Sequence, residues 1–275
     1  MIYISVLALA LAPFVAAQST DHALDIKAIE AHFTQSHVVP DLLSSFNPSA
    51  LLSLNFAGVG DVTPGQPLTK EQVGTTPVVT VTPANSSVQL SGTYTLAMVD
   101  VDAVGADISK GVNRHWLVNG VTVSSSTVSN SSATAITPYA GPWPAAGSGP
   151  HRYVVLLYEQ PSTFSAPEGF TQTGLPVAPM DFAAYVQSSG LTSLVAATYI
   201  TVEEGTATAS ISATSAVVTS TLGQSSSHGS STASGTSSSA SATGSTPANN
   251  GSSRTLSSVA AMSLLGAAII TFIAA

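Results

Sequence analysis

A long segment of small polar residues sets the limit on what this chain can fold into. From about Thr206 to Ser258 the sequence is almost entirely Ser, Thr, Ala and Gly, with one proline and hardly any large apolar side chain. Such a segment cannot bury enough apolar surface to offset the entropy that is lost on ordering. We therefore predict a disordered, O-glycosylated stalk over residues 206–250. The folded part is then confined to residues 21–205, a length that suits one domain.

The first residues are typical of a secretory signal peptide. Met1–Ala17 is a nearly unbroken apolar run that closes on small residues, and we predict cleavage after Ala17. The run is shorter than the roughly 20 residues that a membrane-spanning helix needs. No Lys or Arg stands near Met1, which leaves an uncleaved membrane anchor as the alternative.

A second apolar run covers residues 259–275, and no charged residue follows it. Small residues around Asn250, a polar spacer over 253–258 and this tail match a glycolipid attachment signal. We predict attachment at Asn250 and removal of residues 251–275; the alternative is a single-pass tail, which usually carries Lys or Arg on its cytoplasmic flank. The expected location is the outer face of the plasma membrane or the cell wall, as in a walled cell such as a fungus.

Composition narrows the classes of partner. The chain has no cysteine, so an extracellular domain must be held together by its core alone. Six basic against 14 acidic residues give a formal net charge of −8. Nucleic-acid binding needs clustered Lys and Arg, so this charge argues against a nucleic-acid partner.

The patterning of the folded part is mostly β. Short β-branched or apolar runs predict strands over Val78–Val81, Tyr94–Val99, Trp116–Val118, Tyr153–Tyr158 and Thr198–Val202, the third of them stopping at Asn119-Gly120. Helical spacing predicts a helix over residues 24–33 and a short one over residues 182–187. We predict a mainly β domain with small peripheral helices.

Two sequons carry candidate modification sites. Asn85-Ser86-Ser87 and Asn130-Ser131-Ser132 both match the N-glycosylation pattern. In a secreted chain they are expected on exposed turns.

Charged and aromatic residues stand at the ends of predicted strands. Asp100 and Asp102 close one strand, His115 precedes a second, and His151 and Tyr153 open a third. Burying a charge without a partner is costly, so charges on apolar strands are informative. Because strand ends meet at sheet edges, these five side chains are expected to converge on one small pocket.

The chemistry of such a pocket favours an anion. Two imidazoles and a phenol donate hydrogen bonds, while the carboxylates orient the rings and favour their protonated forms. A loop rich in Pro and Gly, residues 139–150, precedes His151, and its Trp143 is a candidate wall. The alternatives are a structural role for each histidine and a turn cap for Asp100. Arg152 points to the opposite face and is expected to be a structural ion-pair partner.

Three segments in order resemble the phosphatidylethanolamine-binding proteins. Residues 139–161 contain Tyr-x-Gly, then Gly-Ser-Gly-Pro-His-Arg-Tyr-Val and Leu-Leu-Tyr-Glu-Gln-Pro; Tyr94 to Asp102 is similar to the second hallmark of that family. Arg114-His115-Trp116 falls where the family carries its first pocket histidine. The weaker likeness extends from about Val39 to Ile200.

The resemblance implies a two-sheet β fold with a small pocket for phosphorylated head groups. Carried over by position, Asp100 and Asp102 would form the acidic wall of the pocket. The anion donors would be His115, His151 and Tyr153, and the lip of the pocket would be Gly141 to Pro144. Family members usually have proline where this chain has Val101 and Val104. This departure leaves the direction of the Asp102 side chain open.

Four functions compete. The first is a non-catalytic, cofactor-free surface protein that binds a phospholipid head group or another small phosphorylated anion. The second, also implied by the resemblance, is an inhibitor of a serine protease or carboxypeptidase that acts through a loop or terminus. The others are a hydrolase with a two-His, two-carboxylate metal site, and a structural wall protein. We expect no enzyme, because no motif marks a serine or cysteine nucleophile.

Overall fold

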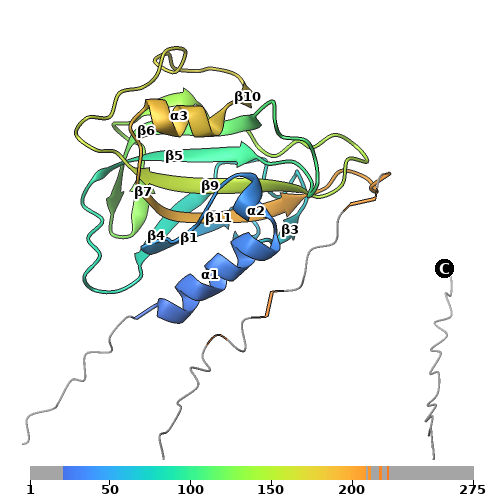
Figure 1. Ribbon diagram of the computed structural model, residues 1–275, viewed down its shortest axis with the longest axis horizontal. Helices are drawn as coiled ribbons and strands as arrows, with labels where there is room; N and C mark the ends of the chain where they lie inside the picture. Colours follow the sequence, from blue (N-terminus) through green and yellow to red (C-terminus); the bar gives the residue numbers. More distant parts are fainter. Residues whose placement is uncertain (1–20, 209, 212–216, 219–221, 223–275) are drawn as a thin grey trace, which may run out of the picture. The chain divides into compact units, whose positions relative to one another are not determined.

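The computed structural model describes residues 21–208, 210–211, 217–218 and 222 (Figure 1). The predicted signal peptide with its cleavage after Ala17, nearly all of the predicted stalk, and the attachment site at Asn250 with its tail lie outside these residues. They stay predictions. None of the described helices has the length and apolar character that crossing a membrane requires.

The described residues form a mainly β domain with three short helices, as the patterning predicted. The helices are α1 (Ala23–Gln35), α2 (Val38–Asp41) and α3 (Phe182–Ser188). The strands are β1 (Ala50–Phe56), β2 (Gly60–Asp61), β3 (Pro67–Leu68), β4 (Val78–Pro83), β5 (Thr93–Asp100), β6 (Val112–Ser124), β7 (Thr127–Ser129), β8 (Thr134–Thr137), β9 (His151–Glu159), β10 (Ala178–Met180) and β11 (Leu194–Val202).

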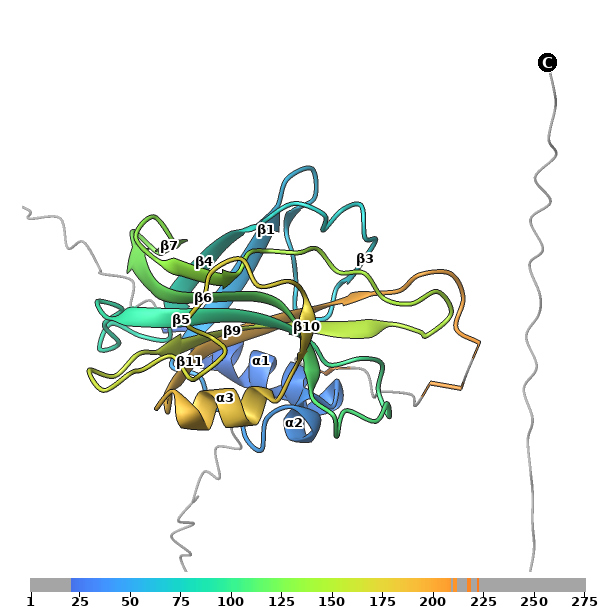
Figure 2. The ribbon, with the colours of Figure 1, turned by 90° about the horizontal axis from the view of Figure 1, so that it is seen from above.

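The strands form a curled sheet in the order β2-β1-β4-β7-β6-β5-β9-β11-β3, and β8 and β10 also pair with β6. Strands β6, β5, β9 and β11 are mutually antiparallel neighbours, whereas the short β3 runs parallel to β11. Figure 2 shows β1 and β4 on one side of these central strands and all three helices on the other. The central strands are therefore covered on both faces.

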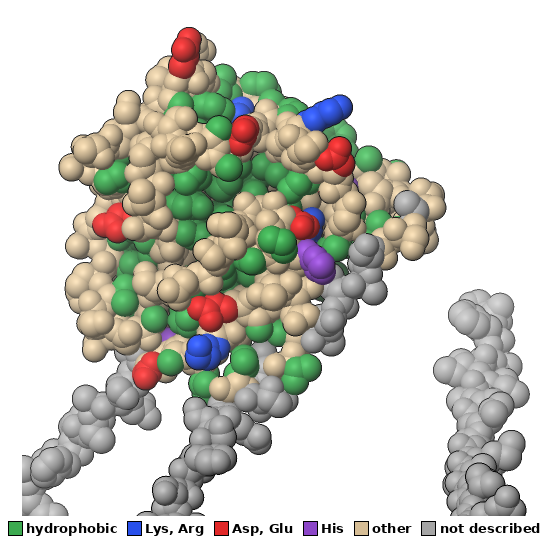
Figure 3. All heavy atoms as spheres, in the orientation of Figure 1, with side chains coloured by type: hydrophobic (Ala, Val, Ile, Leu, Met, Phe, Trp, Pro, Cys, Tyr) green, Lys and Arg blue, Asp and Glu red, His purple; other side chains and the backbone are tan. Residues whose placement is uncertain are grey.

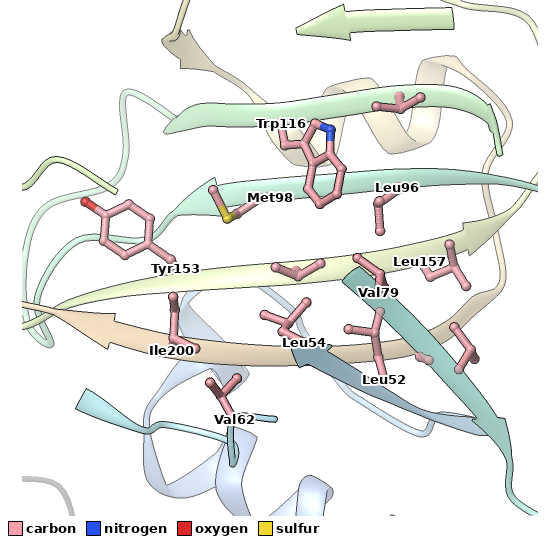
Figure 4. Close-up of a cluster of buried hydrophobic side chains, with 14 of the residues drawn as sticks. Leu52, Leu54, Val62, Val79, Leu96, Met98, Trp116, Tyr153, Leu157 and Ile200 are labelled. Carbon is pink, nitrogen blue, oxygen red and sulfur yellow. The ribbon is translucent and has the colours of Figure 1, made fainter. Parts of the chain in front are cut away.

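Each face of the central strands has its own hydrophobic core. The core between the central strands and β1 and β4 contains Leu54, Met98 and Trp116, which Figure 4 shows with their neighbours. The core under the helices contains Phe33 and Tyr185. A chain without cysteine thus buries two layers of apolar side chains in place of covalent cross-links.

Strand β9 is the shared wall of both cores. Val155 and Leu157 belong to the core beside β1 and β4, whereas Val154 and Leu156 belong to the core under the helices. All four side chains are fully buried. A strand that is buried on both faces needs an unbroken apolar run, which is why this segment predicted a strand so clearly.

The predicted stop of the third strand at Asn119-Gly120 is wrong. Strand β6 continues to Ser124, since Tyr94 pairs with Val121 and Thr95 pairs with Asn119. Gly120 is thus an extra residue, and its φ of +86° allows the bulge. The glycine bends the strand without ending it.

Strand β1 was not predicted. Its sequence Ala-Leu-Leu-Ser-Leu-Asn-Phe alternates buried and more exposed side chains, the period of a strand with one covered face. The predicted helices are confirmed. Helix α1 buries Ile29 and Phe33 one turn apart, and the Asp181 carboxylate accepts a hydrogen bond from Ala184 N at the start of α3.

The surface carries few charges. On the face in Figure 3, acidic and basic side chains are scattered among apolar and uncharged polar ones. This follows from the six basic and 14 acidic residues in a chain of 275.

Candidate functional site

The predicted pocket residues meet where β5 ends and β9 begins. Asp100 is the last residue of β5, and it pairs across the ladder with Tyr153. His151 is two residues from Tyr153 on the same face of β9, and its ring lies 6.3 Å from the tyrosine ring, centroid to centroid. The sheet register therefore brings the carboxylate, imidazole and phenol together.

A β-bulge supplies the second histidine. Met98 pairs with Trp116 and Val99 pairs with Arg114, so His115 is an extra residue on β6. Bulges re-aim side chains in this way. The His115 ring consequently meets the Tyr153 ring edge-on, with 5.2 Å between their centroids.

Both ring nitrogens of His151 lie within 3.3 Å of side-chain oxygen atoms. Its Nδ1 lies 2.9 and 3.0 Å from the two Asp100 oxygens, and its Nε2 lies 2.8 Å from Ser148 Oγ and 3.3 Å from Asp102 Oδ1. The Ser148 hydroxyl donates its proton to Ala145 O at 2.6 Å, so its oxygen is left to accept. Every partner of the ring is an acceptor, which favours the imidazolium.

The pKa of His151 agrees with this assignment. Burial alone would lower the pKa, but the hydrogen bond and charge of Asp100, with the charge of Asp102, more than offset burial. The pKa is therefore raised above its usual value. The raised pKa favours a positively charged His151 ring between the carboxylates of Asp100 and Asp102.

His115 is in the opposite state. Burial lowers its pKa by more than its hydrogen bonds and the charge of Asp100 raise it. Its Nδ1 lies 3.1 Å from Ala140 O, to which it donates. The expectation that the carboxylates would favour protonation of both rings is therefore correct for His151 and wrong for His115, because His115 lies deeper and touches no carboxylate directly.

Tyr153 contributes a protonated phenol. Burial raises its pKa, and the Asp100 carboxylate raises it further. The phenol oxygen accepts a hydrogen bond from Trp143 N at 3.2 Å. In Figure 4 the hydroxyl points away from the hydrophobic cluster. The hydroxyl therefore lies at the polar end of the site, where the Asp100 carboxylate favours its protonated form.

The two aspartates do not lie on one extended strand. Strand β5 ends at Asp100, and Asp102 has a φ of +62°. An Asp100 oxygen accepts from Asp102 N at 2.8 Å, and Asp102 Oδ1 accepts from Ala103 N at 2.6 Å. This tight turn, rather than strand geometry, brings both carboxylates to His151.

Arg152 fixes that turn from the opposite side of β9. Its side chain is 2% exposed and pairs with Asp41 at 2.8 Å, which confirms the predicted structural ion pair. The guanidinium also donates to Ser36 O at 2.9 Å. Its remaining contacts, at 3.0–3.4 Å, are to the carbonyl oxygens of Val101, Asp102 and Ala103. The turn, which contains Val101, is thus held by the side chain of Arg152.

The lip of the site packs against the turn at residues 70–74. Tyr139 donates its hydroxyl to Val73 O at 2.6 Å. A Cβ on Gly141 would lie 2.9 Å from Val73 O, so the glycine permits this close approach. Pro144 is buried, whereas Trp143 is 81% exposed. The loop is therefore anchored at its two ends and presents its tryptophan to solvent.

The structure also shows where the predicted glycosylation acceptors lie. Asn85 and Asn130 are both exposed, as expected of glycosylation acceptors. Within the part of the chain that the structure describes, no group of three or more His, Asp or Glu side chains is arranged to hold a metal ion. The sequence predicts no role for Ser148 within the loop of residues 139–150, and its only signal there is its place three residues before His151.

Comparison with known proteins agrees with the fold. The family profile described as phosphatidylethanolamine-binding protein matches residues 58–200. CEN-like protein 1 of Nicotiana tabacum is 31% identical over 176 residues, 62% of this chain and 91% of that protein. The carboxypeptidase Y inhibitor of Saccharomyces cerevisiae is 30% identical over 172 residues, 52% of this chain and 77% of that protein.

Two further similarities complete the comparison. A 26 kDa secreted antigen of Toxocara canis is 34% identical over 136 residues, and the chain spans 48% of its length. The crystal structure of carboxypeptidase Y inhibitor complexed with its cognate proteinase matches with a TM-score of 0.56 and 23% identity, over 65% of this chain and 96% of that one. From its matched profile, its relatives and its fold, the chain belongs to the phosphatidylethanolamine-binding protein family.

Proposed function

We propose that this protein is a non-catalytic binding protein that captures a small phosphorylated anion, such as a phospholipid head group. The observation that carries the proposal is the placement of His151, which is buried at the start of β9 with oxygen atoms at both ring nitrogens, an arrangement that favours the imidazolium. The residues proposed to form the site are Asp100, Asp102, His115, Gly141, Pro144, His151 and Tyr153.

The surrounding groups suit a phosphate monoester. The imidazolium of His151 and the phenol of Tyr153 are donors, and charge-assisted hydrogen bonds to oxyanions are the strong ones. His115 Nδ1 donates to Ala140 O, so its neutral ring leaves Nε2 as an acceptor for a P–OH proton or an ammonium group. An ammonium group of the ligand would also suit the carboxylate of Asp102, which is 46% exposed.

The non-catalytic part of the proposal needs a separate argument, because Ser148, His151 and Asp100 stand in the order of a Ser-His-Asp triad. The Ser148 Oγ to Nε2 distance is 2.8 Å and the Nδ1 to Asp100 distance is 2.9 Å. A general base must accept the serine proton, yet that proton goes to Ala145 O.

Binding is tested by titrating the purified full chain with phosphoethanolamine and, separately, with inorganic phosphate, between about pH 5 and pH 8. We expect binding that weakens as the pH rises through the raised pKa of His151 and that is lost in His151→Ala. His32→Ala, which removes an imidazole on α1, should bind as the unchanged protein does. Tighter binding of phosphoethanolamine than of phosphate would identify the head group as the source. Equal affinity in His151→Ala would refute the site.

Catalysis is tested with a fluorophosphonate probe, which labels activated serines. We expect no labelling at Ser148 under conditions that label a known serine hydrolase. Labelling that disappears in Ser148→Ala would show an activated nucleophile and overturn the non-catalytic assignment.

Inhibition of a carboxypeptidase is a second candidate function. It is supported by the 30% identity to the carboxypeptidase Y inhibitor of Saccharomyces cerevisiae. The working surface would be a loop or terminus rather than the anion site. Mixing the chain with carboxypeptidase Y should then abolish peptidase activity at nanomolar concentration, and His151→Ala should inhibit equally well. Unchanged peptidase activity at micromolar concentration would eliminate this candidate.

We also propose that the protein is secreted and held on the cell surface by a glycolipid at Asn250. The proposal is supported by the targeting segments in the sequence and by the secreted antigen among the relatives. Phosphatidylinositol-specific phospholipase C should release the protein from cells, and an N-glycosidase should increase its electrophoretic mobility. Retention on the membrane after the lipase would favour the single-pass tail.

A further inference from the structure

The segment that follows β11 crosses the loop that carries Ser148. Gly147 N donates to Glu204 O at 2.8 Å, and Thr208 N donates back to Gly147 O at 2.9 Å. The Thr208 hydroxyl adds a contact to the same carbonyl at 3.2 Å. Residues 203–208, named the strap from here on, therefore pair with Gly147 on both its backbone groups.

One ion pair and one hydrogen bond hold the strap itself. Glu204 pairs with Lys70, with 2.8 Å between Nζ and the carboxylate oxygen, and Lys70 belongs to the turn against which the lip of the site packs. Glu203 accepts a hydrogen bond from Ala207 N at 3.1 Å. Strap, loop and lip are thus joined in one network.

The next residue along the loop, Ser148, occupies the outer nitrogen of His151. Its oxygen lies 2.8 Å from Nε2, and its own proton is committed to Ala145 O. A serine oxygen in this position presents the lone pair that a phosphate oxygen would present. An anion that uses Nε2 must therefore replace the serine oxygen, and the strap opposes any movement of the loop that would carry Ser148 away from His151.

We propose that Ser148 is a built-in competitor for the bound anion, and that the strap holds it at His151 and thereby sets the affinity of the site. The inference rests on the proposed anion-binding function. Residues 206–208 of the strap are also the first residues of the predicted stalk, so the strap lies between the folded domain and its predicted tether.

The size of the effect follows from the contact that is lost. A hydrogen bond to a charged group is worth roughly tenfold in an equilibrium constant. Without the Ser148 oxygen, Nε2 keeps only the longer contact to Asp102, which the ligand can share. Removing the competitor should therefore tighten anion binding by about tenfold.

The test is a titration of the full chain with inorganic phosphate and with phosphoethanolamine, at a pH where His151 is protonated. Ser148→Ala removes the competing oxygen, and Thr208→Pro removes both donors of the strap to Gly147. Each is expected to bind both anions about tenfold more tightly than the unchanged protein. Thr208→Ala, which keeps the backbone donor, should give a smaller gain. Ser162→Ala, at an exposed serine after β9, is the matched control and should not change the affinity.

The double variant distinguishes one mechanism from two. If the strap acts only through Ser148, Ser148→Ala combined with Thr208→Pro should gain no more than either change alone, because the changes share one contact. Unchanged or weaker binding in Ser148→Ala, with binding intact in the unchanged protein, would overturn the inference and leave the proposed function standing. If no variant binds either anion while circular dichroism shows all of them folded, the proposed function fails and the inference fails with it.

Discussion

His115 and His151 are neighbours of the same tyrosine, but their surroundings give them different charges. His151 has a carboxylate against one nitrogen and a second carboxylate near the other, so it holds its proton in spite of burial. His115 has only backbone oxygen within hydrogen-bonding distance, and burial favours its neutral form. One site thus combines a cation with a neutral ring.

This difference should appear in the pH dependence of stability. The raised pKa of His151 means that its interaction with Asp100 contributes fully below the unfolded value of 6.5 and is lost as the pH rises through the folded pKa. His151→Ala should therefore reduce the free energy of unfolding more at about pH 5.5 than at about pH 8.5. Urea denaturation of both proteins at the two pH values measures this.

His115→Ala is the comparison, and its sign is reversed. Its lowered pKa means that the folded state resists protonation and loses stability as the pH falls below 6.5. The cost of His115→Ala should then be smaller in acid. If both variants lose the same stability at both pH values, the assigned charge states are incorrect.

Sequence reasoning reached the residues of the site and not their roles. Charges placed on apolar strands pointed to Asp100, His115 and His151, and these side chains do converge. The role of Ser148 was beyond it, because a serine in a loop of Gly and Pro acquires a partner only when the loop is folded. The state of His115 also depends on depth of burial, which spacing along a chain does not report.

At the scale of elements, the turn after β5 depends on a residue of the neighbouring strand. Arg152 binds three consecutive carbonyl oxygens of that turn and pairs with Asp41. The valines at 101 and 104 therefore leave the turn ordered. The Arg152 side chain on β9 supplies the hydrogen bonds that hold the turn.

Arg152→Met should consequently destabilise the fold by about 3–5 kcal/mol, because it leaves carbonyl groups and a carboxylate without their partner. Asp41→Asn keeps the carbonyl contacts and should cost about 1 kcal/mol. Lys110→Met, at an exposed position, is the control and should stay within about 0.5 kcal/mol. Chemical denaturation gives all three values. A cost for Arg152→Met as small as that of the control would show that the turn is held by other means.

The lip depends on close contact with the turn at residues 70–74. An added methyl at Gly141 would meet Val73 O at 2.9 Å and Gly74 Cα at 3.1 Å, both of them backbone atoms. Gly141→Ala should therefore cost about 1–3 kcal/mol and weaken anion binding by displacing the lip. A methyl at Gly74 meets its nearest atom at 3.4 Å, so Gly74→Ala should be close to neutral in thermal unfolding. Equal melting temperatures for the two variants would contradict this packing.

The burial and pairing of a strand decide whether its sequence predicts it. The strand at 153–158 was evident because both of its faces are buried. The extension of β6 past Gly120 was missed because a glycine that ends a strand and a glycine that bulges it look alike in sequence. Strand β1 was missed because its leucines alternate with less apolar residues in a short run. Both β1 and the extension of β6 are defined by the strands with which they pair, and the sequence does not show which strands pair.

Considered as a whole, the described part of the molecule is a sheet with a core on each side. Strands β5 and β9 each pair with a long strand on both sides and contribute to both cores, whereas β2 and β3 lie at the ends of the strand order. Amide hydrogen exchange followed by mass spectrometry should show the slowest exchange in β5 and β9. The fastest exchange is expected in β2, β3 and the strap, which have few buried neighbours. Uniform exchange across the strands would indicate that the two cores do not unfold in this order.

The overall class was accessible from the sequence because β-branched runs outnumber helical ones and the family motifs fall in order. The curl that places β1 and β4 over the central strands was not. It arises from side-chain packing between segments that are distant in sequence, for which local patterns carry no information.

The polar residues that open β9 also have a consequence for how relatives should be interpreted. Residues 154–158 are apolar and buried toward both cores, so they would tolerate a shift of one position. His151, Arg152 and Tyr153 would not, since a shift would put the guanidinium among the aspartates and an imidazole under the helices. The triplet therefore depends on the register of the sheet as well as on the candidate site. A related protein that no longer binds a ligand could keep these three residues for the sake of its fold. Identity at these positions is therefore a poor measure of shared function.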